Sequence, residues 1–533
     1  MEADYVIVGA GSAGCVLADR LSADGAQVIL LEAGPRDFHP WIHVPAGVLK
    51  LLKNPLVNWN YETEPQAGSG NRAIHWPRGR VLGGSSSING MLFVRGNPAD
   101  FDNWAQMGAR GWSYEECLPH FKAIERYAPG DTEHRGKSGP LLIEDYRTIL
   151  PLTHRFVEGA QQAGFPFAKD LSGETPAEGV GYSQMSRNGR FRGSTAQTFL
   201  RHARRRSNFR VLTNATALRV LLDGRHATGV RIDQMGREID IKARREVIVS
   251  SGSVNSPHLL QVSGIGPAEH LKSIGVDVLH DLTGVGSNLS DHYVARVSVR
   301  VKNARSINEM SRGLLLAGEV VKWVTVGRGA LTFGVSSAQC FCRSREGLAS
   351  PDIQLLFSPA SYDPAVFGAL EREPGATVAV SIARPESRGT IMARSGDPYD
   401  RPVIRPNYLS APADLRVLLA GIGHARSIFA QPAFKENVVA EIVPGPDVKT
   451  DEQLADYARD FGTTLYHPVG TCRMGEDPMA VVDSRLRVHG LSGLRVIDAS
   501  VMPLVTTGNT NAPTIMIAEK GASMIREDAR QSA

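Results

Sequence analysis

The sequence predicts a mixed α/β fold in which one domain is assembled from segments that are distant in the chain. Three observations support this prediction. A buried-strand pattern, a glycine-rich loop and a helical pattern follow one another at residues 5–21. The same order recurs at residues 245–261, and strand patterns with amphipathic helices occupy residues 296–460. We therefore expect an α/β domain joined to a second domain, of α+β type, built on a largely antiparallel sheet.

The first glycine-rich loop has the spacing of a dinucleotide-binding fingerprint. Gly9, Gly11 and Gly14 follow an apolar strand pattern and open a helical one, which is the context in which GxGxxG binds a pyrophosphate. The first glycine permits a tight turn, the second lets the phosphates approach the backbone, and the third lets helix and strand pack closely. The phosphates then lie at a helix N-terminus, where the dipole favours negative charge. The loop therefore predicts a Rossmann-like domain.

An acidic residue ends the second predicted strand. Glu32 follows the apolar residues 28–31, about 20 residues after the loop, where a carboxylate accepts hydrogen bonds from ribose hydroxyls and repels a 2′-phosphate. This position argues against NADP, but it does not distinguish NAD from FAD.

Composition and charge exclude several classes of protein. The chain has 533 residues and a formal net charge of +4, which is small for this length and gives no case for nucleic-acid binding. The basic run at residues 204–206 is interpreted as a solvated helix face, because few aromatic residues are interspersed with it. Five cysteines without regular spacing predict neither a disulfide framework nor a metal site.

The sequence also lacks the signals of export and of membrane insertion. No cationic start followed by an apolar run precedes Tyr5, so we expect no signal peptide. No stretch has the apolar length of a membrane span. The nearest, residues 313–324, contains Glu319 and Lys322 and predicts an amphipathic helix. We expect a cytoplasmic protein in a reducing compartment, with peripheral attachment to a membrane as the alternative.

A second loop, at residues 83–90, is dense in glycine and serine. Such a composition offers many amides and little side-chain bulk, and indicates backbone close to a ligand or in a tight turn. A flexible linker is the alternative. The flanking Trp76, Ile88 and Met91 disfavour it, because large apolar residues are not typical of linkers.

Two candidate catalytic residues lie near the C-terminus. His467 precedes Pro468, which biases its backbone away from helix, and an imidazole on such a segment can act as a general base near neutral pH. Asn511 precedes a helical pattern with Pro513 in its first turn. It is interpreted either as an ordinary helix cap or as an amide placed beside the base.

Together these motifs resemble the glucose–methanol–choline (GMC) family of FAD oxidoreductases, and in particular its bacterial choline-dehydrogenase-like alcohol dehydrogenases and oxidases. The resemblance runs from Tyr5 to about Ile525, which is nearly the whole chain. It rests on six segments in order, which are residues 9–14 with Glu32, 79–89, 252–266, 284–292, 467–475 and 509–514.

The resemblance implies FAD, with its ADP half on the first loop. Some members of the family attach the flavin through a histidine in the second motif, where this chain has Ile88, so we expect non-covalent FAD. By position in the motifs, the residues expected to line the cofactor are Gly9, Gly11, Ser12, Ala13, Gly14, Glu32, Ala33, Trp59, Val81, Asn89, Gly90, Met91, Leu92, Ala217, Asp498, Ala499 and Ala512.

The resemblance also implies the chemistry. His467 matches the base that takes the hydroxyl proton of a primary alcohol while hydride passes to flavin N5, Asn511 matches its partner, and Tyr466 is expected in the substrate pocket. Oxygen, a quinone or a dye would then accept the electrons. The FAD-binding domain is expected to comprise residues 1–150, 208–295 and 461–533, and the substrate-binding domain residues 151–207 and 296–460.

Two other functions fit the same resemblance. One is a flavin-containing lyase, of the hydroxynitrile lyase or photodecarboxylase type. The other is a flavin-binding protein without catalysis, which His467 and Asn511 disfavour. The particular alcohol, the choice between oxidase and dehydrogenase, the electron acceptor and the oligomeric state stay open at this stage.

Overall fold

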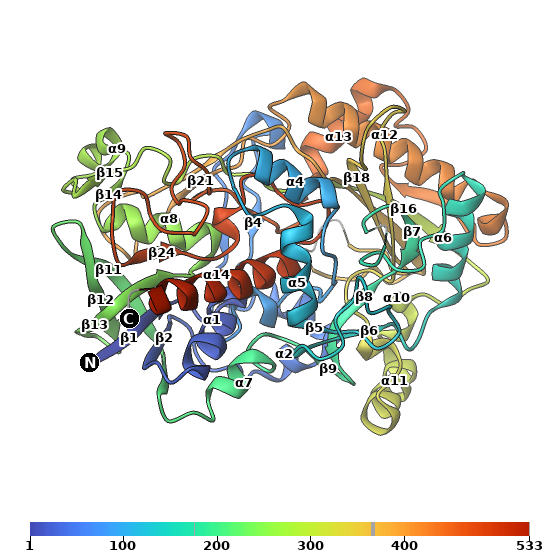
Figure 1. Cartoon of the computed structure of the whole chain (residues 1–533). Coiled ribbons are helices and arrows are strands. Elements are labelled where there is room, and N and C mark those ends of the chain that lie inside the picture. Colours follow the sequence, from blue (N-terminus) through green and yellow to red (C-terminus); the bar gives the residue numbers. More distant parts are fainter. Residues whose placement is uncertain (175, 364–367, 532–533) are drawn as a thin grey trace.

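The computed structural model describes residues 1–174, 176–363 and 368–531. Two large sheets dominate it, one beside the chain termini and one at the opposite end of the molecule (Figure 1). The predicted α/β domain built from distant segments and the predicted antiparallel second sheet are both confirmed. Across the described ranges, no helix combines the length and the apolar character that are needed to cross a bilayer.

The first sheet is a parallel layer with an antiparallel extension. Its parallel strands run in the order β10, β2, β1, β13 and β24, and β12 and β11 continue antiparallel from the long strand β13. The apolar run of β1 and β2 is buried on both faces, as is typical of parallel strands covered by helices. The strands are β1 (Glu2–Val8), β2 (Val28–Glu32), β10 (Phe209–Thr213), β11 (Ala215–Asp223), β12 (His226–Gln234), β13 (Arg237–Val249) and β24 (Leu494–Val496).

The second sheet is antiparallel throughout. Its order is β22, β16, β19, β18, β17 and β7, with the short β23 also paired to β16. Alternate side chains of β16 divide between two environments, because strand side chains point to opposite faces. Val297 and Val299 join an apolar cluster with helices α6 and α12. The elements are α6 (Pro151–Gln162), β7 (Gly179–Tyr182), β16 (Tyr293–Val301), β17 (Ala338–Cys342), β18 (Ile353–Ser358), β19 (Gly375–Ile382), α12 (Pro412–Phe429), β22 (Val438–Val443) and β23 (Thr463–Thr464).

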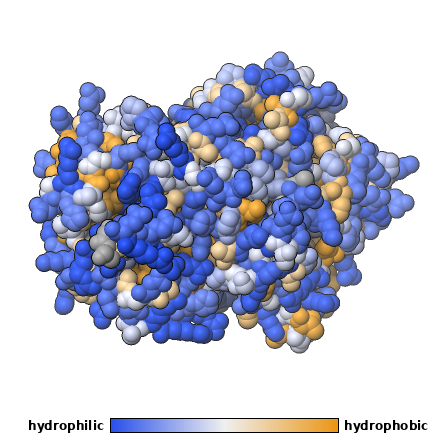
Figure 2. Space-filling model, viewed as in Figure 1, coloured by the Kyte–Doolittle hydropathy of each residue, from blue (hydrophilic) through white to orange (hydrophobic). Residues whose placement is uncertain are grey.

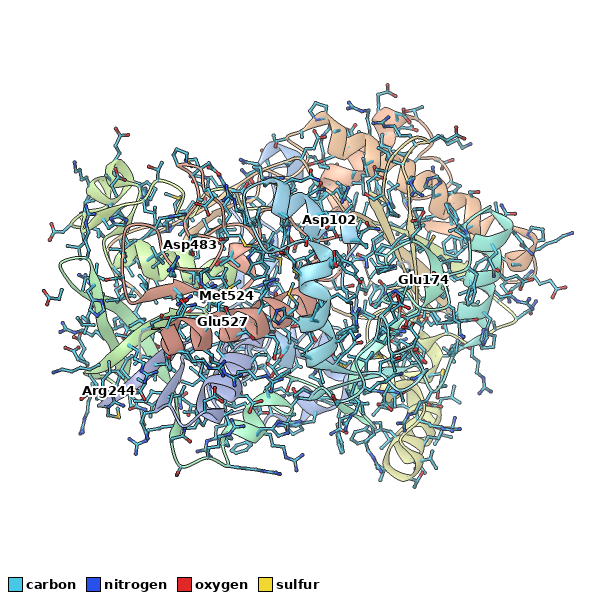
Figure 3. The ribbon with its side chains drawn as sticks, viewed as in Figure 1. Asp102, Glu174, Arg244, Asp483, Met524 and Glu527 are labelled. Atoms are coloured by element: carbon cyan, nitrogen blue, oxygen red, sulfur yellow. The ribbon has the colours of Figure 1, made fainter. Side chains whose placement is uncertain are left out.

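Two helices at opposite ends of the chain pack together against the first sheet. They are α1 (Ser12–Ala23) and α14 (Asn511–Gln531), which lie side by side in Figure 1. Arg485 holds the far end of α14 by donating to the Met524 carbonyl at 2.9 Å and pairing with Glu527 at 3.2 Å. Figure 3 shows Met524 and Glu527 on this helix, with Asp483 nearby. This anchoring fixes the direction in which the N-terminus of α14 points.

The remaining elements connect the sheets and cover them. The helical ones are α2 (Pro40–His43), η1 (Pro45–Gly47), α3 (Val48–Leu51), η2 (Ala67–Ser69), η3 (Gly84–Ser87), α4 (Pro98–Gln106), α5 (Tyr114–Ile124), α7 (Phe199–Ala203), α8 (Gly252–Val262), α9 (Ala268–Ser273), α10 (Ile307–Met310), α11 (Gly313–Val326), η4 (Ala330–Thr332), η5 (Pro432–Phe434), α13 (Asp451–Phe461) and η6 (Ala499–Val501). The strands are β3 (Tyr61–Glu62), β4 (His75–Trp76), β5 (Glu125–Arg126), β6 (Leu141–Asp145), β8 (Gln184–Asn188), β9 (Phe191–Arg192), β14 (Ile265–Gly266), β15 (His280–Asp281), β20 (Thr390–Met392) and β21 (Val403–Arg405).

Candidate active site

A large cavity reaches from the first glycine loop to the polar face of the second sheet. Its volume is about 1260 Å³, and Gly11 and Glu32 line one part while Ser298 and Thr377 line another. Ligand pockets commonly measure about 300–1,000 Å³. This cavity is therefore large enough for a long dinucleotide together with a small substrate.

The glycine loop has the backbone geometry that the sequence predicts. Gly9 has a φ of +100°, and a Cβ there would lie 2.6 Å from the Ser250 carbonyl oxygen. A Cβ at Gly14 would lie 1.9 Å from the Gly9 carbonyl oxygen, so only glycine lets α1 approach β1 this closely. The nearest neighbour of a Cβ at Gly11 is 4.0 Å away, and this residue lines the cavity at the start of α1. The loop therefore leaves the first amides of α1 open to phosphate oxygens.

Glu32 stands at the end of β2, facing the same cavity. Its carboxylate accepts hydrogen bonds from Ala10 N at 3.1 Å and Gly34 N at 2.9 Å. Burial raises the pKa of Glu32 to about 7, against the effect of these two hydrogen bonds. The two amides fix the carboxylate where ribose hydroxyls can donate to it.

Most of the residues predicted to line the cofactor do line the cavity. They are Gly9, Gly11, Ser12, Ala13, Glu32, Ala33, Trp59, Asn89, Gly90, Met91, Leu92, Ala217, Asp498 and Ala499. Gly14, Val81 and Ala512 are not among the residues that line the cavity, and their place beside the cofactor stays a prediction. Val81 packs with Ile42 and Ile88 in a small apolar cluster, Ala512 belongs to the main core, and Gly14 provides the close helix–strand contact described above. These three residues pack behind the cavity wall.

His467 lines the cavity and is part of a hydrogen-bonded chain that also contains Asn509, His292 and the Ala383 carbonyl. The Nδ1 atom of His467 lies 2.9 Å from Nδ1 of His292, and its Nε2 atom lies 3.1 Å from Nδ2 of Asn509. On the far side, Nε2 of His292 lies 3.1 Å from the Ala383 carbonyl oxygen. Both histidine rings are buried.

These partners determine which ring nitrogens carry protons. The Ala383 carbonyl can only accept, so Nε2 of His292 is protonated. In a neutral ring the other nitrogen then accepts, so the proton shared by the two rings belongs to Nδ1 of His467. His467 therefore carries its lone pair on Nε2, the nitrogen beside Asn509. This is the tautomer that a general base requires at the cavity wall.

Burial also keeps both rings neutral. It lowers the pKa of His467 well below the ordinary histidine value, and the neighbouring His292 and Arg78 lower it further. Burial lowers the pKa of His292 to about 4. At neutral pH the Nε2 lone pair of His467 is consequently available to accept a proton.

The structure pairs His467 with Asn509, not with Asn511 as the sequence predicts. Asn511 is the first residue of α14, and its Oδ1 accepts a hydrogen bond from Ser12 Oγ at 2.7 Å. Asn509 lies in the preceding loop, where Gln354 Nε2 donates to its Oδ1 at 3.2 Å and so turns its amide nitrogen towards His467. The motif contains both asparagines two residues apart, and only the path of the loop distinguishes them.

Asp291 and His292 are two further site residues that sequence reasoning did not single out. The Asp291 carboxylate accepts from His467 N at 2.8 Å and from Thr464 Oγ1 at 2.6 Å. Burial raises its pKa, and these hydrogen bonds counteract the shift. Tyr466, which was predicted in the pocket, lines the cavity with a φ of +69°. The only sequence signal for Asp291 and His292 is their place at the end of the motif at residues 284–292.

Within the described residues, no group of three or more His, Cys, Asp and Glu side chains is placed to hold a metal ion.

Comparison with known proteins agrees with this geometry. Residues 3–294 and 385–518 match the N- and C-terminal domains described as GMC oxidoreductase. An alcohol dehydrogenase (acceptor) from Pseudomonas putida is 41% identical over 530 residues, covering 98% of this chain and 95% of the relative. An oxygen-dependent choline dehydrogenase from Photobacterium profundum is 43% identical, with 98% and 92% covered.

A solved structure is similar over the same length. Pyridoxine 4-oxidase from Mesorbium loti superimposes with a TM-score of 0.89 at 31% identity, with 98% of this chain and 99% of that chain covered. With family matches over most of its length and full-length relatives at 41% and 43% identity, the chain belongs to the GMC oxidoreductase family of FAD-dependent enzymes that act on CH–OH donors.

Proposed function

We propose that this protein oxidises a primary alcohol, whether aliphatic, aromatic or a polyol, to the aldehyde, with His467 as the general base. One observation carries the proposal. The two hydrogen bonds of His292 place the lone pair of His467 on Nε2. His467 lines the same cavity as the first glycine-rich loop. A neutral imidazole held in this way can take the hydroxyl proton of an alcohol.

His467 and Asn509 have different roles in the proton transfer. The alcohol hydroxyl donates to Nε2 of His467, and Asn509 Nδ2 donates to the alcohol oxygen, so the two side chains orient the substrate. Bound FAD supplies the acceptor for the hydride that leaves the alcohol carbon. Because burial holds the pKa of His467 low, its imidazolium releases the proton again readily and the base is regenerated.

The N-terminus of α14 supports charge at the same wall. Asn511 and Thr514 of its first turn line the cavity, and residues 511–514 include no acidic side chain. A helix N-terminus carries partial positive charge, worth about 0.3–1 kcal/mol to a nearby anion. We propose that it stabilises negative charge that develops in the cavity during turnover.

FAD is proposed to bind without a covalent link. At the position where relatives with attached flavin have a histidine, Ile88 is 3% exposed and packs in an apolar cluster, and an aliphatic side chain cannot form the bond. We also propose that residues 1–150, 208–295 and 461–533 form the domain that holds FAD. Residues 151–207 and 296–460 would form the substrate side.

Rapid mixing with alcohols tests the proposal. Anaerobic holoenzyme is mixed with a panel of primary alcohols, including choline, benzylic alcohols, pyridoxine and polyols, and flavin absorbance is followed. We expect at least one of them to bleach the flavin, after which reoxidation by oxygen or by a quinone identifies the acceptor. Product formation without flavin bleaching, or only under blue light, would instead show a lyase.

A further inference from the structure

Helix α11 exposes most of its apolar side chains to solvent. Among its residues, all of which the structure describes, only Glu319 is buried. Leu314 is 92% exposed, and Val321, Val324 and Val326 are each more than half exposed. A helix that is apolar on most sides is normally covered. The sequence predicted an amphipathic helix here, and the helix is found, but its apolar side chains point to solvent.

Figure 2 shows the same feature on the surface. Hydrophobic side chains gather at the lower edge of the molecule, where Figure 1 places α11. The helix is nevertheless held firmly at its base, because Glu319 accepts from Ala330 N at 2.7 Å and Trp323 Nε1 donates to the Arg190 carbonyl at 3.0 Å. The exposure is therefore a property of a fixed helix.

Further exposed apolar residues continue this surface. The Trp323 ring packs against Phe191 of β9 at 5.7 Å, and Phe191 is itself 45% exposed. Helix α2, which carries the exposed Trp41, contacts β9, and η1 contacts η4. We call the surface formed by residues 36–57, Phe191 and residues 311–334 the apolar face. Tryptophan and phenylalanine at its edge are typical of segments that meet the headgroup region of a bilayer.

The charges of the apolar face are all of one sign where they meet solvent. Its two longer segments contain six cations, which are Arg36, Lys50, Lys53, Arg312, Lys322 and Arg328, and only two acids. Both acids, Asp37 and Glu319, are buried. A second copy of the chain docked face to face would oppose cations with cations. An anionic lipid surface instead attracts them.

We propose that the apolar face docks this protein on the surface of an anionic phospholipid bilayer, with α11 inserted into the headgroup and acyl boundary. Exposed apolar area and a cationic rim are the two features that bind interfacial helices. The docking would have a consequence for the cavity, because Val48, Leu49 and Lys53 of the same face line its wall. The cavity would then open beside the bilayer, where apolar alcohols and membrane-dissolved electron acceptors are concentrated.

Vesicle flotation tests the proposal. Full-length holoenzyme is mixed with vesicles of phosphatidylcholine alone or with phosphatidylglycerol added, and protein floating with lipid is measured. We expect binding to the anionic vesicles that weakens with salt. The variant L314Q/V321Q/V324Q should lower the partition by about tenfold or more, since each lost apolar side chain removes buried area. Arg36→Gln with Arg328→Gln should lower it by about fivefold per cation.

A variant with three apolar substitutions outside the apolar face serves as the matched control. The variant M235Q/L279Q/V439Q changes three exposed apolar residues outside this face and should bind vesicles like the wild type. Turnover of a water-soluble alcohol should be the same in all variants, which separates this proposal from the proposed function. Absence of flotation at low salt, equal binding by the α11 variant, or a solution dimer that this variant dissociates would each overturn the proposal.

Discussion

His292 and His467 face each other through their Nδ1 atoms at 2.9 Å, with the two rings nearly perpendicular at 84°. The Ala383 carbonyl fixes the proton on the outer nitrogen of His292. His292 therefore fixes the tautomer of His467. In a histidine ring, the hydrogen bond made by one nitrogen determines which nitrogen carries the proton. We assign His292 as a positioning residue, since it is buried and is not among the residues that line the cavity.

Replacement of His292 should impair catalysis without loss of FAD. His292→Leu removes the acceptor for Nδ1 of His467, so the ring can adopt the wrong tautomer, and we expect kcat/KM to fall by about 10²-fold. His292→Gln retains a carbonyl oxygen that can accept the same proton and should recover part of the loss. Steady-state kinetics with flavin content measured in parallel checks this. Equal activity of the leucine and glutamine variants would contradict the tautomer argument.

Replacement of His467 by alanine should lower kcat by about 10²–10⁴-fold, the usual contribution of a general base. The flavin spectrum and the melting temperature should change little. In the wild type, kcat/KM should rise with pH as His467 loses its proton and then reach a plateau. Because the pKa of His467 is lowered, that plateau should begin below the ordinary histidine value of 6.5. An acid limb centred above this value would assign the base to another group.

Kinetic measurements should distinguish the role of Asn509 from that of Asn511. Asn509→Ala removes the amide beside Nε2 of His467, and we expect a loss in kcat of about 10²-fold, comparable to removing one donor from an oxyanion site. Asn511→Ala removes a hydrogen bond to Ser12 in the glycine loop and should affect FAD affinity more than kcat. Stopped-flow reduction and FAD titration of both variants distinguish these effects. The reverse ranking would restore Asn511 as the partner of the base.

Glu32→Gln should weaken FAD binding. The amide keeps the size of the side chain but offers only one oxygen to the amides of Ala10 and Gly34 and to a ribose hydroxyl. Hydrogen bonds to a charged group are worth about 1.5–3 kcal/mol, so we expect Kd for FAD to rise by about tenfold or more. Fluorescence titration of apoenzyme measures it. An unchanged Kd would show that the ribose binds elsewhere.

Stability should fall in mild acid because of buried neutral histidines. Burial lowers the pKa of both His258 and His292 to about 4, against 6.5 for an ordinary histidine. Between these values the unfolded chain binds protons that the folded protein does not, so the free energy of unfolding decreases as pH falls. Urea unfolding across this range measures the slope, and His258→Leu should make it shallower. Parallel slopes for the variant and the wild type would contradict this origin.

Local sequence determined much of the fold and of the cofactor site. The positions of Gly9 and Gly14 followed from spacing alone, because a tight turn and a close helix–strand contact both need a residue without a side chain. The apolar runs of β1 and β13 likewise identified buried strands.

Tertiary structure alone decided which groups contact His467. The sequence could not rank Asn509 above Asn511, because the choice depends on the direction of a loop that is held by Gln354 of the second sheet and Ser12 of the first loop. Nor could it pair His292 with His467, which are 175 residues apart in the chain. The periodicity of α11 predicted a helix but not its exposure. Periodicity and spacing are local properties, whereas hydrogen-bond partners, tautomers and exposure depend on what distant segments bring to the same place.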